Sequence, residues 1–534
     1  SVEHTCNTIT ELTAGNFSAR VELRQEMSPE IRTIATGLNR LADKLNALIQ
    51  SEKDSAEKVK NAEIAALACL LVVLAPPVAG QLQPLRIDHH GWQIVAVLAA
   101  LNGLFARRSA VGAWTAGLAL ALGMAISLEL LPIAALIGGV FALRWLEDPR
   151  EPRGLTHFVA ALALGSVGAF LLTRGLADLS ARCDAISPPY LAGLTVLASG
   201  LAVLERRAAR RGVLLAAGLG LAGVLALATT LALAPNCSRG PFEALDPLVR
   251  DLWYANVLEG RPVWLQPINV MLQMVVPPAV GLLAAVRLWL RGPEPQRPLW
   301  RDYTLVLAGL LVLAMAVSRS SAFACAAGAV PLAWQVREWL RGLRRTKDAT
   351  RRAALVMAIL AAVMPGALGA VAAKLQPDGK AVQARPDPMR VCDIRSAGRA
   401  LDHLPPATIL APLDIGPTLL TYSRHRVVAT GHHRAAPAMR DAIAAFTGTP
   451  AEARAIVLRH GARYILLCPA LPEVINYRDH APTGFTAQLM RGQVPGWLRP
   501  VRLDPRTGVL VWEVIQAPPA DQPGMKPSAS PFMQ

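Results

Sequence analysis

The chain has 534 residues, of which 53% are hydrophobic and only 17% are charged, and its formal net charge is +16. Its mean hydropathy is +0.35. This composition is typical of a protein that crosses a membrane many times, and it excludes a wholly soluble enzyme or binding module.

The first sixty residues, 1–60, differ from the rest because they are polar. Apolar residues spaced alternately by three and four positions predict a helix with a coiled-coil seam; they are Ile31, Ile34, Leu38, Leu41, Leu45 and Leu48. Such a seam predicts a homodimer through residues 31–48.

A turn-and-extended stretch, Gly15–Val21, precedes this helix, which we expect to start at Glu30. The arrangement resembles a cytoplasmic HAMP signalling module, and a generic amphipathic hairpin is the alternative. Because HAMP modules follow a transmembrane helix, we expect the chain to continue upstream of Ser1 or to contain a junction near Asn61.

Residues 61–374 contain repeated apolar runs, each near the ~20 residues that cross a bilayer core. They predict a polytopic α-helical membrane domain with about eleven spans. The expected spans are roughly 62–80, 92–106, 110–128, 130–146, 155–173, 190–205, 212–234, 266–288, 303–318, 320–336 and 353–373.

Basic residues gather in alternate loops, such as those at Arg206–Arg211 and Arg341–Arg352. With residue 60 in the cytoplasm, these clusters lie inside, as the positive-inside rule requires. The net charge then follows from topology, and we expect no nucleic-acid partner. We expect a bacterial inner (plasma) membrane protein whose loop at Asp88, and whose chain after residue 374, face the extracytoplasmic side.

Four of the seven cysteines fall in predicted outer segments: Cys183, Cys237, Cys392 and Cys468. Two disulfides are open to them because the outside is oxidising. Three cysteines are expected to stay unpaired, inside or within the membrane: Cys6, Cys69 and Cys325. The alternative is that all seven are free thiols.

Residues 375–516 predict an extracytoplasmic α/β domain. Strands are expected at Thr408–Leu410, Val427–Val428 and Tyr464–Leu467, and helices at Ala436–Phe446 and Ala451–His460. The tail, 517–534, is rich in Pro, Ser and Gln, which predicts disorder.

Polar residues that are costly near lipid gather at the predicted outer ends of the spans. They are Arg86, Asp88, His89 and His90 in one loop, Glu129 between two apolar runs, Glu259 in a long loop, Arg319 between two late spans, and Asp414, His432 and His433 in the C-terminal domain.

Each of these residues also has a structural explanation. Asp88 and the adjoining histidines could cap a helix, Glu259 could be a solvated loop acid, and Arg319 could extend to the lipid headgroups. Interfacial solvation explains Glu129 equally well, and histidines on a domain surface are common.

Together, these residues resemble the catalytic subunit of oligosaccharyltransferases and, more broadly, the GT-C class of glycosyltransferases. The resemblance covers residues 62 to about 515. In that family an acidic Asp-His-His motif at an outer helix end is matched by Asp88-His89-His90. A later loop with a Glu is matched by Asn256–Pro262.

The resemblance implies a metal-dependent glycosyltransferase with a polyprenyl-phosphate-linked sugar donor and membrane lipids as partners. The ligands of one divalent cation, Mn²⁺ or Mg²⁺, would be Asp88, His90 and Glu259. Arg319 would contact the donor phosphate. The residues beside the site would be Arg86, His89, Glu129 and Asp414.

The chemistry fits these residue types. A lipid-linked sugar leaves its carrier as a phosphate or pyrophosphate, so a hard cation is needed to take up negative charge. Carboxylates favour Mg²⁺ or Mn²⁺, and an imidazole shifts the preference toward Mn²⁺. The planar fork of Arg319 suits phosphate oxygens.

The chain also departs from the family pattern. The family's catalytic base is an acidic residue in the first outer loop, and here the HAMP-like segment occupies that place. The catalytic residue is therefore unknown, and the chain in this form could be inactive. The Trp-Trp-Asp motif that reads an Asn-x-Ser/Thr acceptor is replaced by Ala411–Asp414, which contains no tryptophan. We expect a lipid, polysaccharide or other acceptor.

Two other functions stay open. A HAMP-containing membrane sensor would couple outer events to a cytoplasmic partner through the dimer at residues 31–48 and would need no metal. A transporter is the third hypothesis, but the polar residues gather at the outer face and no internal repeat is visible.

Overall fold

The computed structural model describes residues 29–83, 89–106, 110–148, 153–207, 212–240, 242, 245–367, 369–370 and 392–515. They belong to two compact units: Ser1–Ala79 with Val276–Thr304 and Cys325–Val363, and Gly80–Val275 with Leu305–Ala324 and Met364–Gln534. Some predictions fall outside the described residues, namely those for Cys6, Gly15–Val21, Arg86, Asp88 and the tail 517–534.

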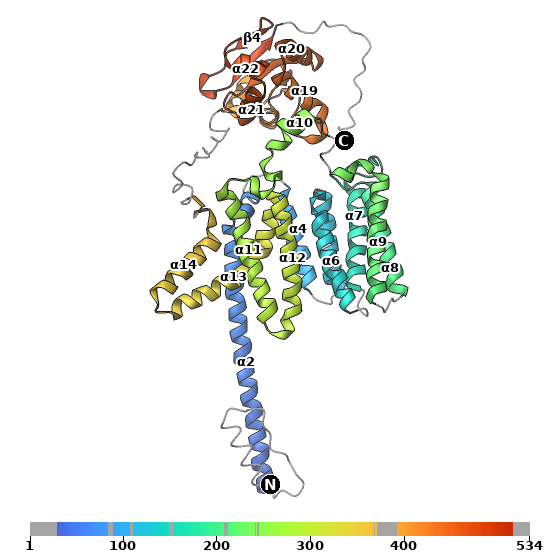
Figure 1. The fold of residues 1–534 in the computed structure, drawn as a ribbon, viewed down its shortest axis with the longest axis vertical. Helices are drawn as coiled ribbons and strands as arrows, with labels where there is room; N and C mark the ends of the chain where they lie inside the picture. Colours follow the sequence, from blue (N-terminus) through green and yellow to red (C-terminus); the bar gives the residue numbers. More distant parts are fainter. Residues whose placement is uncertain are drawn as a thin grey trace. The chain divides into compact units, whose positions relative to one another are not determined.

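The residues before 364 are mostly helical, as Figure 1 shows. The helices are α2 (Pro29–Leu74), α3 (Pro76–Gln81), α4 (His90–Phe105), α5 (Ala110–Ile126), α6 (Leu131–Glu147), α7 (Arg153–Thr173), α8 (Pro188–Arg207), α9 (Gly212–Leu233), α10 (Pro247–Leu252), α11 (Ile268–Arg291), α12 (Arg297–Ala316), α13 (Ser321–Arg345) and α14 (Ala349–Val363).

Six helices in the described part are long and apolar enough to cross a membrane: Leu128–Glu147, Arg153–Thr173, Pro188–Arg206, Gly212–Leu233, Ile268–Arg291 and Glu294–Ala316. Two shorter apolar helices, His90–Phe105 and Ala110–Ile126, match two further expected spans. The chain is thus a multi-pass membrane protein, and the count of about eleven spans stays a prediction.

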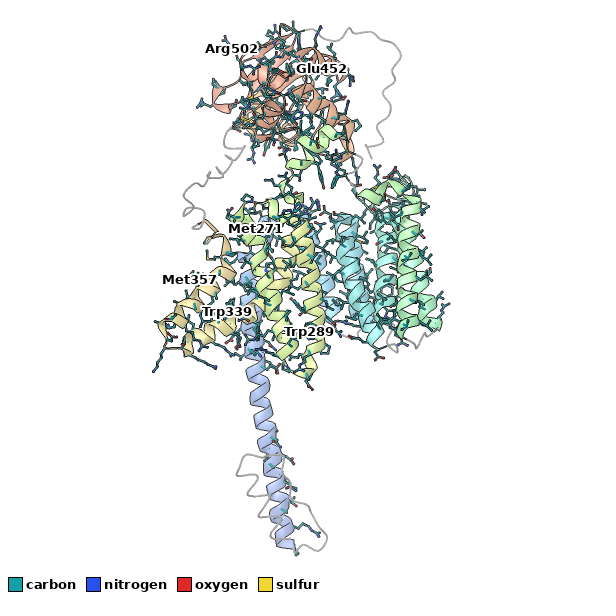
Figure 2. All side chains as sticks on the ribbon, viewed as in Figure 1. Met271, Trp289, Trp339, Met357, Glu452 and Arg502 are labelled. Atoms are coloured by element: carbon teal, nitrogen blue, oxygen red, sulfur yellow. A yellow bond between two sulfur atoms is a disulfide. The ribbon has the colours of Figure 1, made fainter. Side chains whose placement is uncertain are left out.

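Helix α2 continues through residue 60 without a break and ends at Leu74, just before Pro76 and Pro77, since proline disfavours a helix in the preceding residue. Within its unit, the apolar end of α2 packs against α13 in a cluster that includes Ala68, Leu71, Leu332 and Val336. Trp339, labelled in Figure 2, packs against the same cluster. The HAMP-like module stays a prediction.

Small residues let several helices of the other unit approach closely. A Cβ at Gly103 on α4 would collide with the backbone carbonyl of Gly112 on α5, and one at Gly117 on α5 would collide with the carbonyl of Phe158 on α7. Helices α4, α5 and α7 therefore form a tightly packed group.

The C-terminal domain is a mixed α/β structure, which confirms the predicted class. Its elements are α17 (Ile394–Leu401), β1 (Thr408–Leu410), α18 (Gly416–Tyr422), β2 (Arg426–Val427), α19 (Ala436–Thr447), α20 (Pro450–Arg459), β3 (Ala462–Leu467), α21 (Pro472–His480), α22 (Phe485–Met490), β4 (Leu498–Val501) and β5 (Leu510–Val514). The sheet order is β2-β1-β3-β5-β4.

In this sheet, β1 runs parallel to β2 and β3, while β5 runs antiparallel to β3 and β4. Strand β3 lies in the middle, and its side chains are almost all buried. Thr449 caps α20 in a reciprocal capping box with Glu452, which is labelled in Figure 2. A disulfide, Cys392–Cys468, joins the start of the described domain to the end of β3.

Candidate functional site

His90 begins α4, and a buried glutamine one turn later fixes its ring. The His90 side chain is only 7% exposed. Its Nδ1 lies 2.8 Å from Oε1 of Gln93, which is fully buried. Because an amide oxygen only accepts, Nδ1 carries the proton, which leaves the Nε2 lone pair facing outward from this pair. The rings of His89 and His90 lie 4.2 Å apart.

Glu259 lies in the short 3-10 turn η4 (Leu258–Gly260) and stands between two other site residues. Its Oε1 is 3.9 Å from Nε2 of His90 and 3.9 Å from Nη1 of Arg319. Its side chain is 44% exposed, which also agrees with the alternative that Glu259 is a solvated loop acid. These distances exceed hydrogen-bond length but lie within the range of an ion pair, so the three groups face one another.

Arg319 lies in η7 (Ser318–Ser320), between α12 and α13, and its side chain is 19% exposed. Its Nη2 forms an ion pair with Glu129, which lies in η1 (Leu128–Leu130). Its Nε is buried and has no hydrogen-bond acceptor among the described residues. A guanidinium with an unused buried donor is suited to an anionic oxygen.

Backbone and side-chain hydrogen bonds tie the Glu259 turn to the Arg319 turn. The amide of Ser318 donates to the carbonyl of Arg261 at 3.0 Å, and its hydroxyl donates to the same carbonyl at 2.6 Å. The side-chain amide of Gln266 donates through Nε2 to Oγ of Ser318 at 3.0 Å and to the carbonyl of Leu258 at 2.5 Å. These bonds hold η4 and η7 in fixed register.

The structure therefore brings four of the residues singled out from the sequence together: His90, Glu129, Glu259 and Arg319. Asp88 and Arg86 lie outside the described residues. Within the described part of the chain, no group of three or more His, Cys, Asp or Glu side chains is placed to hold a metal. His90 and Glu259 bring two side chains of these types within 3.9 Å of each other.

Sequence reasoning missed Gln93, Ser318 and Gln266, which orient the site. Gln93 had a usable signal, since it is an amide in an apolar helix at i+3 from His90. No sequence signal marked Ser318 or Gln266, because their hydrogen-bond partners, Arg261 and Leu258, lie 57 and 8 residues away in loops of irregular shape.

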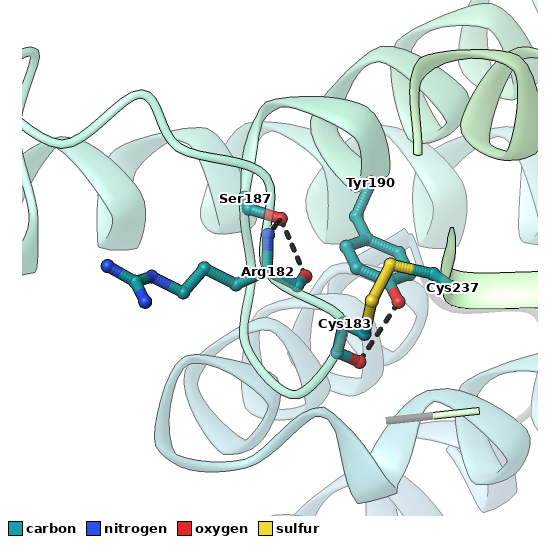
Figure 3. The surroundings of a disulfide bond; sticks show 5 residues. All are labelled: Arg182, Cys183, Ser187, Tyr190 and Cys237. Carbon is teal, nitrogen blue, oxygen red and sulfur yellow. Dashed lines mark hydrogen bonds between the residues drawn. A yellow bond between two sulfur atoms is a disulfide. The ribbon is translucent and has the colours of Figure 1, made fainter. Parts of the chain in front are cut away.

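A second polar cluster surrounds Asp184, next to the Cys183–Cys237 disulfide. Figure 3 shows the loop at this disulfide: the amide of Arg182 donates to Oγ of Ser187 at 3.1 Å, and the hydroxyl of Tyr190 donates to the carbonyl of Cys183 at 3.1 Å. The four predicted outer cysteines thus form two disulfides, while Cys69 and Cys325 are free.

Asp184 accepts hydrogen bonds from two residues of the sequence motif that follows β2. His433 Nε2 lies 2.8 Å from Oδ2 of Asp184, and Arg434 donates to the same oxygen through Nε at 3.0 Å and Nη2 at 2.8 Å. Burial raises the pKa of Asp184, but these hydrogen bonds outweigh it and hold the pKa well below its usual range. His433 therefore has a structural partner in Asp184, which agrees with the alternative that it is a histidine on the domain surface.

Asp414 lies in the loop between β1 and α18, in the C-terminal domain. Its backbone amide donates to Oε2 of Glu473 at 2.9 Å, and the protein around its carboxyl desolvates it and raises its pKa. Glu473 was not singled out from the sequence.

This combination of a multi-pass helical domain, a polar site at helix ends and a C-terminal α/β domain is similar in fold to archaeal oligosaccharyltransferases of the GT-C type. No protein-family model matches the sequence, and no curated protein matches it. The likeness is therefore one of structure.

One similar structure is the apo oligosaccharyltransferase of Archaeoglobus fulgidus, with 16% identity, a TM-score of 0.53, and coverage of 78% of this chain and 57% of that one. Another is AglB of the same organism in complex with an inhibitory peptide and a dolichol-phosphate, with 15% identity, a TM-score of 0.55, and coverage of 80% and 57%. The chain thus spans little more than half the length of these relatives, and the likeness establishes the fold.

Proposed function

We propose that the chain is a membrane glycosyltransferase that transfers a sugar from a polyprenyl-phosphate-linked donor to an extracytoplasmic acceptor in the bacterial inner membrane. The arrangement of His90, Glu259 and Arg319 supports this proposal, because an imidazole, a carboxylate and a guanidinium lie within 3.9 Å of one another in turn, and such groups suit a metal ion and a phosphate. The AglB structure with a dolichol-phosphate supports a lipid phosphate as the donor's leaving group.

The residues fit a divalent cation by their chemistry. An imidazole with its Nε2 lone pair and a carboxylate 3.9 Å away are the donors that Mn²⁺ accepts, and Asp88 would add a second carboxylate. When bound, Mn²⁺ or Mg²⁺ would neutralise charge on the donor phosphate. His90 is held in the required tautomer by Gln93, which is how metal-binding histidines are commonly oriented.

Arg319 is the proposed phosphate-binding residue. Its buried Nε is unused, and its two Nη groups face Glu129 and Glu259, so a phosphate oxygen would find a guanidinium already held in place. Glu129 thereby orients Arg319. The catalytic base is unassigned, and the C-terminal domain with Asp414 would lie on the acceptor side. The acceptor would not be an Asn-x-Ser/Thr sequon.

The test uses the full chain in lipid nanodiscs with a tritiated polyprenyl-phosphate hexose. We expect Mn²⁺-dependent release of hexose, abolished by chelation and by Glu259→Gln or Arg319→Ala. The matched controls are Glu294→Gln and Arg297→Ala, a pair with the same 3.9 Å separation at an exposed turn, which should leave release unchanged. Release that survives both chelation and Glu259→Gln contradicts the proposal.

Metal binding provides a readout that does not require turnover. Titration with Mn²⁺, followed by electron paramagnetic resonance of the free ion, should show a site in the wild type that Glu259→Gln weakens and Glu294→Gln does not. Equal Mn²⁺ affinity in the wild type and Glu259→Gln would remove Glu259 from the metal site.

The continuity of α2 favours a signalling role as the second candidate. Glu63 on α2 pairs with the buried Arg337 on α13 at 2.6 Å, and α13 begins two residues after Arg319. A sensor would show disulfide crosslinking of Leu38→Cys or Leu45→Cys that changes with an outside ligand. Crosslinking that never changes, together with metal-dependent transfer, would exclude it.

A further inference from the structure

A buried carboxylate fixes the loop that follows β1. Glu473, in the first turn of α21, is only 8% exposed. Its Oε1 accepts the backbone N–H of Leu413 at 2.8 Å, and its Oε2 accepts that of Asp414 at 2.9 Å. Tyr477, one turn later, donates its hydroxyl to Oε1. Both oxygens thus have donors, which a buried carboxylate needs to offset its lost hydration.

The order of the strands places this loop at a distinctive point of the sheet. From β1 the chain passes through α18 to β2, and it returns through α19 and α20 to β3 on the other side of β1. The direction of strand order thus reverses between β1 and β3. In open parallel sheets, ligands bind in the crevice outside the carboxyl ends of the strands at such a switch point. Asp414 follows β1, and Glu473 follows β3.

The loop itself is anchored on both sides of one exposed acid. Leu413 is fully buried and Ile415 is 2% exposed, whereas Asp414 has exposed surface even though the surrounding protein partly desolvates its carboxyl. At Gly416, where α18 begins, a Cβ would lie 2.9 Å from the carbonyl oxygen of Ala429, just after β2. The backbone is therefore held by Glu473 and by close packing, and the Asp414 carboxylate is left at the switch point.

We propose that Glu473 is a positioning residue that holds the Asp414 carboxylate where it accepts a hydrogen bond from a hydroxyl-bearing acceptor. This inference rests on the proposed glycosyl transfer, since an acceptor is what Asp414 would receive. Without the Glu473 carboxylate, the amides of Leu413 and Asp414 lose their shared acceptor and the loop relaxes. The donor site at Arg319 involves none of these residues.

Protonation of Glu473 supports the same role. Burial and then the neighbouring charge of Asp414 raise the pKa of Glu473 to about 7. The titratable groups that face it are Asp414 and Tyr477. A protonated carboxyl has one poorer acceptor oxygen for the same three donors, so its hold on the loop weakens as the pH falls below about 7.

The first measurement is amide hydrogen exchange of the full chain in nanodiscs, for the peptide that spans residues 411–416. Glu473→Gln should speed its exchange roughly tenfold or more relative to β3 at the same pH, the loss of about one buried hydrogen bond. In the wild type, exchange corrected for its intrinsic pH dependence should speed up below about pH 7, and in Glu473→Gln it should not.

Glu452→Gln is the matched control, because Glu452 also stands in the first turn of a helix of this domain and accepts a backbone amide, that of Thr449 at 2.7 Å. It should leave the 411–416 peptide unchanged. A loop whose exchange is the same in the wild type and Glu473→Gln overturns the positioning role.

The second measurement separates acceptor from donor. With a tritiated polyprenyl-phosphate hexose as donor and hexyl glucoside as the acceptor probe, Glu473→Gln should raise the KM for hexyl glucoside roughly tenfold. Release of hexose to water, which uses the donor site alone, should change by less than about twofold. An equal loss in both reactions overturns the positioning role. If the wild type releases no hexose, glycosyl transfer fails as the function, and the exchange profile still decides whether Glu473 holds the loop.

Discussion

Glu473 should also make the stability of the C-terminal domain depend on pH. Burial and the charge of Asp414 raise its pKa from the ordinary 4.5 to about 7. Between these values the folded domain binds more protons at this site than the unfolded chain does, so stability falls as the pH rises through the window. Each pKa unit is worth about 1.4 kcal/mol, so the full change is roughly 3 kcal/mol.

Amide exchange of β3 in the full chain reports the free energy of opening of the domain core. Between pH 4.5 and 8, the free energy of opening of the wild type should fall by roughly 3 kcal/mol relative to that of Glu473→Gln, because the glutamine cannot titrate. Asp414→Asn should reduce the loss, because it removes the charge that raises the Glu473 pKa. A wild-type-to-Gln difference that stays constant across the window would refute the reasoning.

Three further changes have definite expected outcomes. Gln93→Leu should weaken Mn²⁺ binding roughly ten- to a hundredfold by freeing the His90 ring, while Gln335→Leu, at another buried glutamine on α13, should not; equal affinities of the wild type and Gln93→Leu in a Mn²⁺ titration would contradict this. Asp184→Asn should cost about 1–3 kcal/mol of local stability around Arg434, seen as faster amide exchange at residues 432–436. The Cys392→Ser variant should lose roughly 4 kcal/mol of unfolding free energy, because the disulfide closes a 76-residue separation; denaturant unfolding of the C-terminal domain checks it.

The sequence predicted the helices well and the sheet in part, for physical reasons. Apolar runs of membrane length form helices almost regardless of their neighbours, so the ranges at 155–173 and 212–234 closely match α7 and α9. The strands β4 and β5 were missed. Leu498–Val501 contains an arginine and a proline, and its pairing with β5 depends on β5 pairing with β3, which no local pattern encodes.

For the site, the sequence identified the residue types but not the contacts between them. His90, Glu259 and Arg319 stand out because polar groups are rare near lipid. The ion pair between Arg319 and Glu129 joins residues 190 positions apart, and only the packing of the helices that carry them brings it about. The Glu473 clamp on Leu413 and Asp414 is hidden for the same reason, since nothing in α21 marks its glutamate as buried.

The charges at the site set the order in which ligands should bind. Glu129 and Glu259 both pair with the guanidinium of Arg319, so these three groups together carry one more negative than positive charge. An anionic lipid phosphate approaching Arg319 would compete with both carboxylates and be repelled by the excess charge. We therefore expect polyprenyl phosphate to bind weakly in the presence of a chelator and more tightly with Mn²⁺, a dependence that Glu129→Gln should reduce because it removes one competing carboxylate. Calorimetric titration of nanodiscs with polyprenyl phosphate measures the affinity of the wild type and of Glu129→Gln with chelator and with Mn²⁺. Equal affinity of the wild type under the two conditions would show that Arg319 is accessible without a cation.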